Sequence, residues 1–225
     1  HYGLGGRLQA LGSQQDLNYR VDSDQGRFVL KICRGDYSAL ELQAQHAGLK
    51  HLAEHPDVHV PRVIAAKNGA DLLSLEVAGQ AVHVRLLDYI EGQSLTHLEH
   101  FNRQVVAGFG RLCGEMDLAL ADFEHPGLVR TLQWDARHAH ALIAHLLPVI
   151  KDETQRRLIV EASGQAERHL LPLQDKLPVQ AIHMDITDDN VVWQRDAQRH
   201  WQLQGVIDFG DLIRTWRITD LSVTC

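Results

Sequence analysis

The chain has 225 residues, of which 44% are hydrophobic, and its formal net charge is −7 at pH 7. This length and composition can bury a substantial core, in one domain or in two small lobes. The acidic balance provides no basic surface for nucleic acid or a membrane, and no apolar run approaches the ~18 residues of a membrane span. The three cysteines are odd in number and far apart, which favours a reducing compartment, so we expect a cytoplasmic protein.

The first part of the chain is predicted to be rich in strands. Residues 7–32 alternate between turn and strand signals, which predicts a hairpin followed by a third strand. Segment 13–18, before the second strand, is small and polar, so Ser13 and Asn18 can donate hydrogen bonds to phosphate oxygens. An ordinary hairpin loop is the alternative interpretation. Residues 38–54 then predict a helix with one apolar stripe.

Strand signals continue to about residue 91. Residues 62–67 and 71–77 are joined by Asn68-Gly69, which predicts a hairpin between them, and residues 81–90 read as a further apolar strand. From Thr96 onward the periodicity becomes helical, with a core-type stripe over residues 103–122 and another helix over residues 151–171.

Residues 179–211 organise the rest of the chain. They predict a buried strand (179–183), a polar loop (184–189), a short strand (190–193) and a last apolar strand (203–207) that leads into Asp208-Phe209-Gly210-Asp211. Two loops that leave neighbouring strands at the same end would bring Asp185, Asn190 and Asp208 together. Their oxygen atoms suit Mg²⁺ and not a soft metal, and an aspartate beside such a metal can take a proton from a hydroxyl. This combination fits phosphoryl transfer.

The spacing of these residues carries a resemblance. The pattern H-x-D-x-x-x-x-N (His183 to Asn190), followed 18 residues later by D-F-G-D, is the spacing of the kinase catalytic loop and its metal-binding partner. Without Arg in the middle position, and with I-D-F-G-D in full, it resembles the aminoglycoside phosphotransferase-like kinases. Those kinases phosphorylate small alcohols such as aminoglycosides, choline, ethanolamine, homoserine and hydroxylysine. Met184 stands where that family most often has Gly.

The resemblance covers essentially the whole chain and implies an α+β, two-lobed protein-kinase-like fold. An antiparallel N-lobe sheet with one helix would occupy residues 1–91, and a mainly helical C-lobe would occupy residues 92–225. The resemblance also implies ATP and Mg²⁺. Asp185 would accept the proton of the substrate hydroxyl, and Asn190 and Asp208 would bind the metal.

Lys31 lies in the otherwise apolar strand 28–32, where an ammonium group needs a partner. It is either an exposed strand lysine or, as the downstream motif favours, the lysine that bridges the α- and β-phosphates of ATP and pairs with a helix carboxylate. We expect Glu41 to be that carboxylate. By resemblance, the backbone of Asp88, Tyr89 and Ile90 would form the hinge that binds adenine.

The segment LGSQQDLNYRV and the F-x-H-P and W-D elements resemble the hydroxylysine kinase-like branch. A hydroxylated amine is therefore the expected small-molecule partner, with neither nucleic acid nor membrane. Trp134 and Asp135 either help to hold an ammonium group, or are a half-buried ring and a helix N-terminal Asp. The chain begins at His1 without Met and stops at Cys225, so we expect a truncated chain, with fusion to another metabolic enzyme possible.

Two other functions stay open at this point. One is a catalytically weak nucleotide-binding module, and the other is a metal-dependent phosphate-ester hydrolase built on Asp185, Asn190 and Asp208. His183 is expected to bond the backbone around the loop rather than to act in catalysis. Asp211 is expected to steady the same loop, or to bind substrate or metal indirectly.

Overall fold

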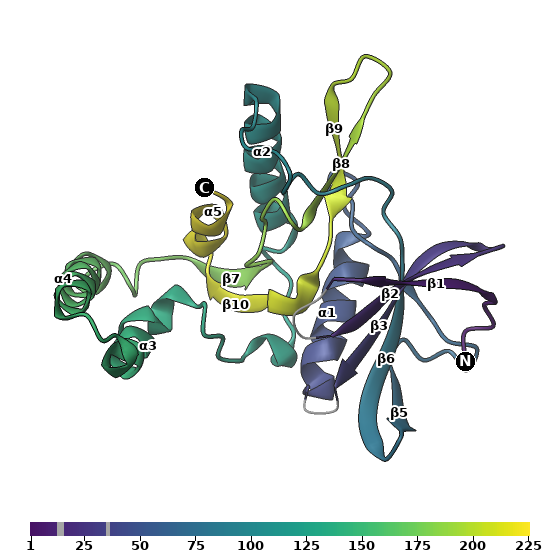
Figure 1. The fold of residues 1–225 in the computed structure, drawn as a ribbon, viewed down its shortest axis with the longest axis horizontal. Coiled ribbons are helices and arrows are strands. Elements are labelled where there is room, and N and C mark those ends of the chain that lie inside the picture. Colours follow the sequence, from purple (N-terminus) through teal and green to yellow (C-terminus); the bar gives the residue numbers. More distant parts are fainter. Residues whose placement is uncertain (13–15, 35–36) are drawn as a thin grey trace.

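The computed structural model describes residues 1–12, 16–34 and 37–225. The first third of the chain forms a six-stranded antiparallel sheet in the order β1-β2-β3-β6-β4, with β5 also pairing β6 (Figure 1). The strands are β1 (Gly6–Leu11), β2 (Leu17–Ser23), β3 (Gly26–Arg34), β4 (Val63–Ile64), β5 (Leu73–Val77) and β6 (Gln80–Asp88). One helix, α1 (Ala39–Leu52), begins after Ser38 and packs beside this sheet.

The predicted hairpin at Asn68-Gly69 is wrong, although the turn itself is present and Gly69 has a φ of +82°. Strands β4 and β5 do not pair with each other, because both pair with β6 at different points along it. The hairpin lies one connection later, between β5 and β6. Its turn is Ala78-Gly79, whose two residues have φ values of +51° and +78°, the left-handed conformation that tight hairpin turns require.

The second part of the chain is mainly helical. Its helices are α2 (Arg103–Ala119), α3 (Ala139–Leu146), α4 (Glu153–Leu170) and α5 (Ile218–Thr224), with 3-10 turns η1 (Pro126–Leu128), η2 (Ala136–His138), η3 (Leu147–Val149) and η4 (Phe209–Asp211). Asn102 and Asp152 cap α2 and α4 by accepting hydrogen bonds from the backbone of the first turn. Helices α3 and α4 lie together on the side away from the sheet (Figure 1).

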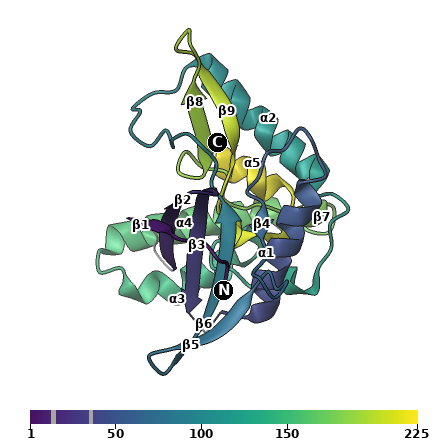
Figure 2. The same cartoon turned by 90° about the vertical axis from the view of Figure 1, so that its right-hand side faces the viewer.

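Two small antiparallel pairs carry the motif residues. Strand β7 (Val179–Ile182) pairs with β10 (Ile213–Trp216), and β8 (Val191–Arg195) pairs with β9 (Trp201–Val206). The sequence had suggested that β7 and β8 are neighbours in one sheet, but they belong to separate pairs. Strand β10 was not predicted. Figure 2 shows the β8–β9 hairpin extending beside α2.

One hydrophobic core joins the two parts of the chain. It combines buried residues of α1 and α2 with residues of β8, β9 and η4. Trp193, at 1% exposure, fills its centre, and a Cβ on Gly108 of α2 would lie 2.5 Å from the Trp193 ring, so the helix packs directly on the indole. The predicted α+β class is confirmed. None of the helices in the described residues is long and apolar enough to cross a bilayer.

Candidate active site

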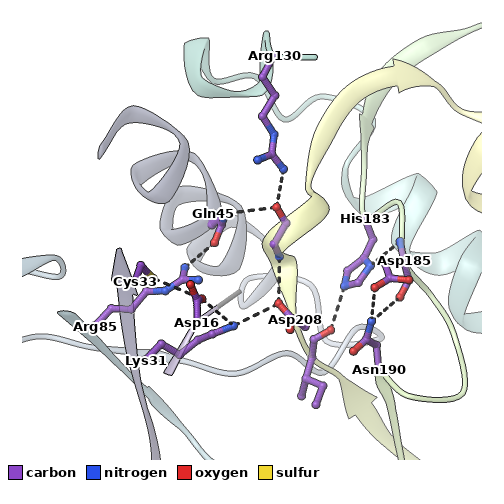
Figure 3. A network of polar contacts seen from close by, with 12 residues as sticks. Asp16, Lys31, Cys33, Gln45, Arg85, Arg130, His183, Asp185, Asn190 and Asp208 are labelled. Atoms are coloured by element: carbon purple, nitrogen blue, oxygen red, sulfur yellow. Dashed lines mark hydrogen bonds and ion pairs between the residues drawn. The ribbon is translucent and has the colours of Figure 1, made fainter. Parts of the chain in front are cut away.

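Lys31 faces the C-terminal motif across the boundary between the two parts of the chain. Its side chain is 8% exposed, and its Nζ lies 3.2 Å from Asp208 Oδ1 and 3.8 Å from Asp16 Oδ2 (Figure 3). The interpretation as an exposed strand lysine is therefore wrong. Residues far apart in the sequence meet here because β3 and the segment after β9 approach each other.

The expected pairing of Lys31 with Glu41 is wrong. Glu41 Oε2 lies 3.7 Å from Nη1 of Arg130, whereas the ion pairs of Lys31 are with Asp16 and Asp208. One helical turn after Glu41, Gln45 faces the site, accepting a hydrogen bond of 2.6 Å from the buried Arg85 and donating one of 3.5 Å to the Gly210 carbonyl.

Of the two predicted phosphate-binding residues, Ser13 and Asn18, the structure describes Asn18. Asn18 lies in β2 rather than in a loop, and its Cα pairs with that of Lys31. Paired residues of neighbouring strands share one face of the sheet, so Asn18 lies on the face of Lys31. Its Oδ1 is buried and has no hydrogen-bond partner within the described residues, so it can accept a hydrogen bond from a ligand, whereas a phosphate oxygen would need the Nδ2 donor of the same amide. Ser13 lies outside the described residues.

Asp185 and Asn190 are brought together by the loop after β7. Asn190 Nδ2 donates to Asp185 Oδ2 at 2.6 Å and to the Asp185 carbonyl at 3.0 Å. Burial, together with the nearby carboxylate of Asp211, raises the pKa of Asp185 above its ordinary value, against the opposing hydrogen bond from Asn190. The other Asp185 oxygen, Oδ1, has no hydrogen bond within the described chain and can accept one from a substrate hydroxyl.

Asp208 has an unusual backbone conformation, with φ +62° and ψ +79°, in the left-handed region. Its Oδ1 accepts hydrogen bonds from Lys31 Nζ and from Gly210 N–H, each at 3.2 Å. Burial alone would raise the pKa of Asp208, but the ammonium of Lys31 and the guanidinium of Arg85 outweigh it and hold this pKa below its ordinary value. Asp208 therefore stays an anion.

The residues present fit a magnesium ion held partly by a nucleotide. In the part of the chain that the structure describes, Asp208 Oδ2 and Asn190 Oδ1 make no hydrogen bond, so both oxygens are available as ligands. The same residues contain no group of three His, Cys, Asp or Glu side chains arranged to hold a metal. Mg²⁺ commonly takes one or two protein ligands and completes its shell with water and phosphate oxygens, so a site of this kind needs no third carboxylate.

His183 supports the loop, as predicted. It is fully buried, its Nε2 lies 3.1 Å from the Ile207 carbonyl, and its Nδ1 accepts the Asp185 N–H at 3.2 Å. Its ring meets Phe209 edge-on with centroids 4.6 Å apart. Burial lowers the pKa of His183 to about 4, so the ring is neutral and can accept the Asp185 N–H.

Asp220 is a functional support that the sequence did not reveal. Its buried carboxylate accepts the N–H of His183 at 3.2 Å and of Met184 at 2.7 Å. Met184 has a φ of +73°, a conformation that Gly adopts more readily than a residue with a side chain. Its side chain is accommodated in an apolar cluster with Ile182 and Ile213. Because Asp220 follows the motif by many residues and stands in no motif of its own, only its position in the fold identifies it.

The predicted hinge residues lie at the end of β6, of which Asp88 is the last residue. Asp88 N–H donates to the Arg62 carbonyl and Tyr89 N–H to the Arg27 carbonyl, so neither donor is free for adenine. The Asp88 carboxylate also pairs with Arg62. Among the described residues, the Ile90 N–H makes no backbone hydrogen bond, and it is the remaining donor of the three.

Asp135 and Trp134 differ in their burial and in their contacts. Asp135 is fully buried, caps η2 through Arg137 N–H, pairs with the Arg137 guanidinium at 2.6 Å and accepts from Thr215 at 2.8 Å. Its oxygens are thus committed to the protein, as the helix-terminus interpretation had it. Trp134 is 61% exposed, more than the expected half-buried ring.

Comparison with known proteins agrees with this geometry. Residues 7–225 match the phosphotransferase enzyme family. The chain belongs to this family. The resemblance to aminoglycoside phosphotransferase-like kinases is confirmed, and with it the kinase-like fold.

Two curated relatives share most of this phosphotransferase chain. Hydroxylysine kinase of Danio rerio is 26% identical over an alignment 238 positions long, which covers 99% of this chain and 65% of the relative. Homoserine kinase of Polaromonas naphthalenivorans (strain CJ2) is 30% identical over 211 residues, which cover 91% and 60%. The chain thus spans less than two thirds of the length of these relatives.

Solved structures share the phosphotransferase fold. A microcompartment-associated aminopropanol kinase has a TM-score of 0.79 at 20% identity, over 100% of this chain and 70% of that one. Amicoumacin kinase in complex with AMP-PNP, Ca²⁺ and its ligand has a TM-score of 0.75 at 17% identity, over 99% and 64%. At these identities the similarity shows the fold alone.

Proposed function

We propose that this phosphotransferase moves the γ-phosphoryl group of ATP to the hydroxyl of a small amino alcohol or hydroxylated amino acid. The observation that carries the proposal is the contact of 3.2 Å between Lys31 and Asp208, two motif residues from different parts of the chain. Beside it lies the Asp185–Asn190 pair. A buried lysine on the N-terminal sheet that faces Asp208 suits the phosphates of a nucleotide bound between the two parts of the chain, and it therefore favours a kinase over a phosphate-ester hydrolase.

Each polar group has a proposed role in the transfer. Lys31 binds the α- and β-phosphates, with Asn18 on the same face of the sheet, and the Ile90 N–H binds adenine. Asn190 and Asp208 would hold Mg²⁺ through their free side-chain oxygens, and the ion would supply positive charge that offsets the charge on the transferring phosphoryl group. Asp185 accepts a hydrogen bond from the substrate hydroxyl and takes its proton late, because the transition state of phosphoryl transfer is loose.

The acceptor is proposed by chemistry and similarity. Hydroxylysine and homoserine, named in the two relatives, both carry an amine and a hydroxyl. The carboxylates of Asp189 and Asp211, which act on Asp185, create with it a negative potential that favours a cationic substrate. We therefore place hydroxylysine-like compounds first, then ethanolamine or choline, homoserine and aminoglycosides. We also propose a cytoplasmic location and two lobes that meet near residue 91.

An acceptor screen tests the proposal. ADP release would be measured with hydroxylysine, ethanolamine, choline, homoserine and an aminoglycoside, with the Asp185→Asn variant as matched control. We expect one hydroxylated amine to stimulate ADP release in the wild type and not in the variant. Magnesium-dependent nucleotide binding without stimulation by any acceptor would favour the nucleotide-binding module instead, and release of phosphate from simple esters would favour the hydrolase.

A further inference from the structure

Arg130 is a buried cation to which the proposed transfer gives no role. It follows η1, and its side chain is 9% exposed. A buried guanidinium must be paired and hydrogen-bonded to offset the loss of its hydration. The groups that Arg130 bonds therefore indicate what it holds in place.

The guanidinium of Arg130 donates hydrogen bonds to the turn that follows Asp208. Arg130 Nη2 donates to the Gly210 carbonyl at 2.5 Å (Figure 3). It also donates to the Leu212 carbonyl at 3.0 Å. These carbonyls belong to the end of η4, where carbonyl groups have no partner within the helix. Gln45 of α1 donates to the same Gly210 carbonyl from another direction, at 3.5 Å.

On its other side Arg130 is tied to α1. Glu41 Oε2 lies 3.7 Å from Arg130 Nη1, and Glu41 and Gln45 share one face of α1 because they are four residues apart. The turn η1, which precedes Arg130, is packed tightly against α1, since a Cβ on Gly127 would lie 2.2 Å from the Leu40 carbonyl. Arg130 thus has little freedom to move away from the turn.

The turn held in this way fixes the backbone of Asp208. Asp208 occupies the left-handed region, which is unfavourable for a residue with a Cβ and persists where the surroundings determine it. Its Oδ1 accepts Gly210 N–H, and the carbonyl of the same Gly210 accepts Arg130 and Gln45. A shift of Gly210 would move the carboxylate that faces Lys31.

We propose that Arg130, neutralised by Glu41, is a positioning residue that holds the turn after Asp208 so that its carboxylate faces Lys31 and the metal. This inference rests on the proposed metal-binding role of Asp208. It also accounts for Glu41, whose carboxylate serves α1 and the turn rather than Lys31. Gln45 also helps to hold the turn, because Arg85 donates to its Oε1 and so directs the amide Nε2 toward Gly210.

The test compares nucleotide binding with and without Mg²⁺ in the 225-residue chain. Calorimetry of ADP would be run on the wild type, Arg130→Met, Arg130→Lys and the control Arg156→Met. Arg156 is a matched control because it also bonds a carboxylate, Glu153, and a backbone carbonyl, that of Ile150, but on α4. In Arg130→Met we expect the tightening of ADP by Mg²⁺ to fall about tenfold or more, with metal-free affinity within about twofold of the wild type.

A lysine keeps the positive charge, but its single nitrogen cannot occupy both the position of Nη2, which bonds the two carbonyls, and that of Nη1 beside Glu41, so Arg130→Lys should recover part of the tightening. Arg156→Met should behave as the wild type. If Arg130→Met does not fold, Glu41→Gln supplies the readout, because it keeps the shape and removes the neutralising charge; its tightening should fall at least threefold. If Mg²⁺ tightens ADP binding in folded Arg130→Met, or in Glu41→Gln, as much as in the wild type, the inference is overturned but the proposed function is not. Absence of any Mg²⁺ effect in the wild type overturns the proposed function as well.

Discussion

Replacing Asp220 with Asn should change how stability depends on pH. Burial, reinforced by the nearby carboxylate of Asp117, raises the pKa of Asp220 to about 7, although two backbone N–H groups oppose this. In the unfolded chain the same group titrates near ~3.9. Below pH ~4 both states carry the proton, between ~4 and ~7 only the folded state keeps it, and above that both have lost it.

The size of the effect follows from this window. A folded state that binds more protons than the unfolded state loses ~1.4 kcal/mol of stability per pH unit. From pH 5.5 up to the folded pKa of about 7, this amounts to about 2 kcal/mol. Asn cannot titrate, and its loss of one acceptor for the N–H groups of His183 and Met184 costs about 1–3 kcal/mol at every pH.

Urea unfolding at pH 5.5 and pH 8.0 would measure the difference between wild type and Asp220→Asn. We expect the wild-type advantage to be larger at pH 5.5, by about 2 kcal/mol, because titration of other groups cancels between the two proteins. Asp117→Asn is the control for the neighbouring acid, and the wild-type slope should largely survive in it. An advantage that is equal at the two pH values would refute the raised pKa and the burial argument behind it.

Three further substitutions test the site and its frame. Asp185→Asn should lower kcat by ~10²- to 10⁴-fold, the scale of a positioned base, while ADP affinity in calorimetry stays close to that of the wild type; unchanged turnover would remove Asp185 from the reaction. Lys31→Met should raise the KM for ATP by roughly 10- to 100-fold, because it removes charged hydrogen bonds to phosphate, and steady-state kinetics with an unaltered KM would contradict that role. Gly92→Ala should lower stability by about 1–3 kcal/mol in thermal unfolding, since Gly92 has a φ of +142° and a Cβ would lie 2.6 Å from the Trp193 carbonyl; an Ala variant as stable as the wild type would argue against this close approach.

The motif residues could be predicted because their relations are local or stereotyped. Asp185 and Asn190 lie in one loop, and Asp208 comes just after the last apolar strand of the predicted motif, which the structure shows as β9. Lys31 was recognisable because an ammonium in an apolar strand needs a partner. The sequence did not reveal that the loop depends on Asp220, because burial of a single Asp leaves no pattern of its own.

Pairings between elements were harder to predict than the elements themselves. The partner of Glu41 depends on how α1 is rotated and on Arg130, which arrives from a distant segment. The hairpin at Asn68-Gly69 failed for a similar reason. Strand β6 is long enough for β4 and β5 to pair with different stretches of it, so a correct turn joined two strands that are not partners.

Calorimetry of ADP binding to the wild type and to Asp208→Ala, each with and without Mg²⁺, addresses the central claim most directly. In the wild type, Mg²⁺ should tighten ADP binding, since the ion would be shared between nucleotide phosphates and the oxygens of Asp208 and Asn190. In Asp208→Ala that tightening should disappear. Equal ADP affinity in the two proteins at every Mg²⁺ concentration would contradict a metal-assisted phosphoryl-transfer site in this chain.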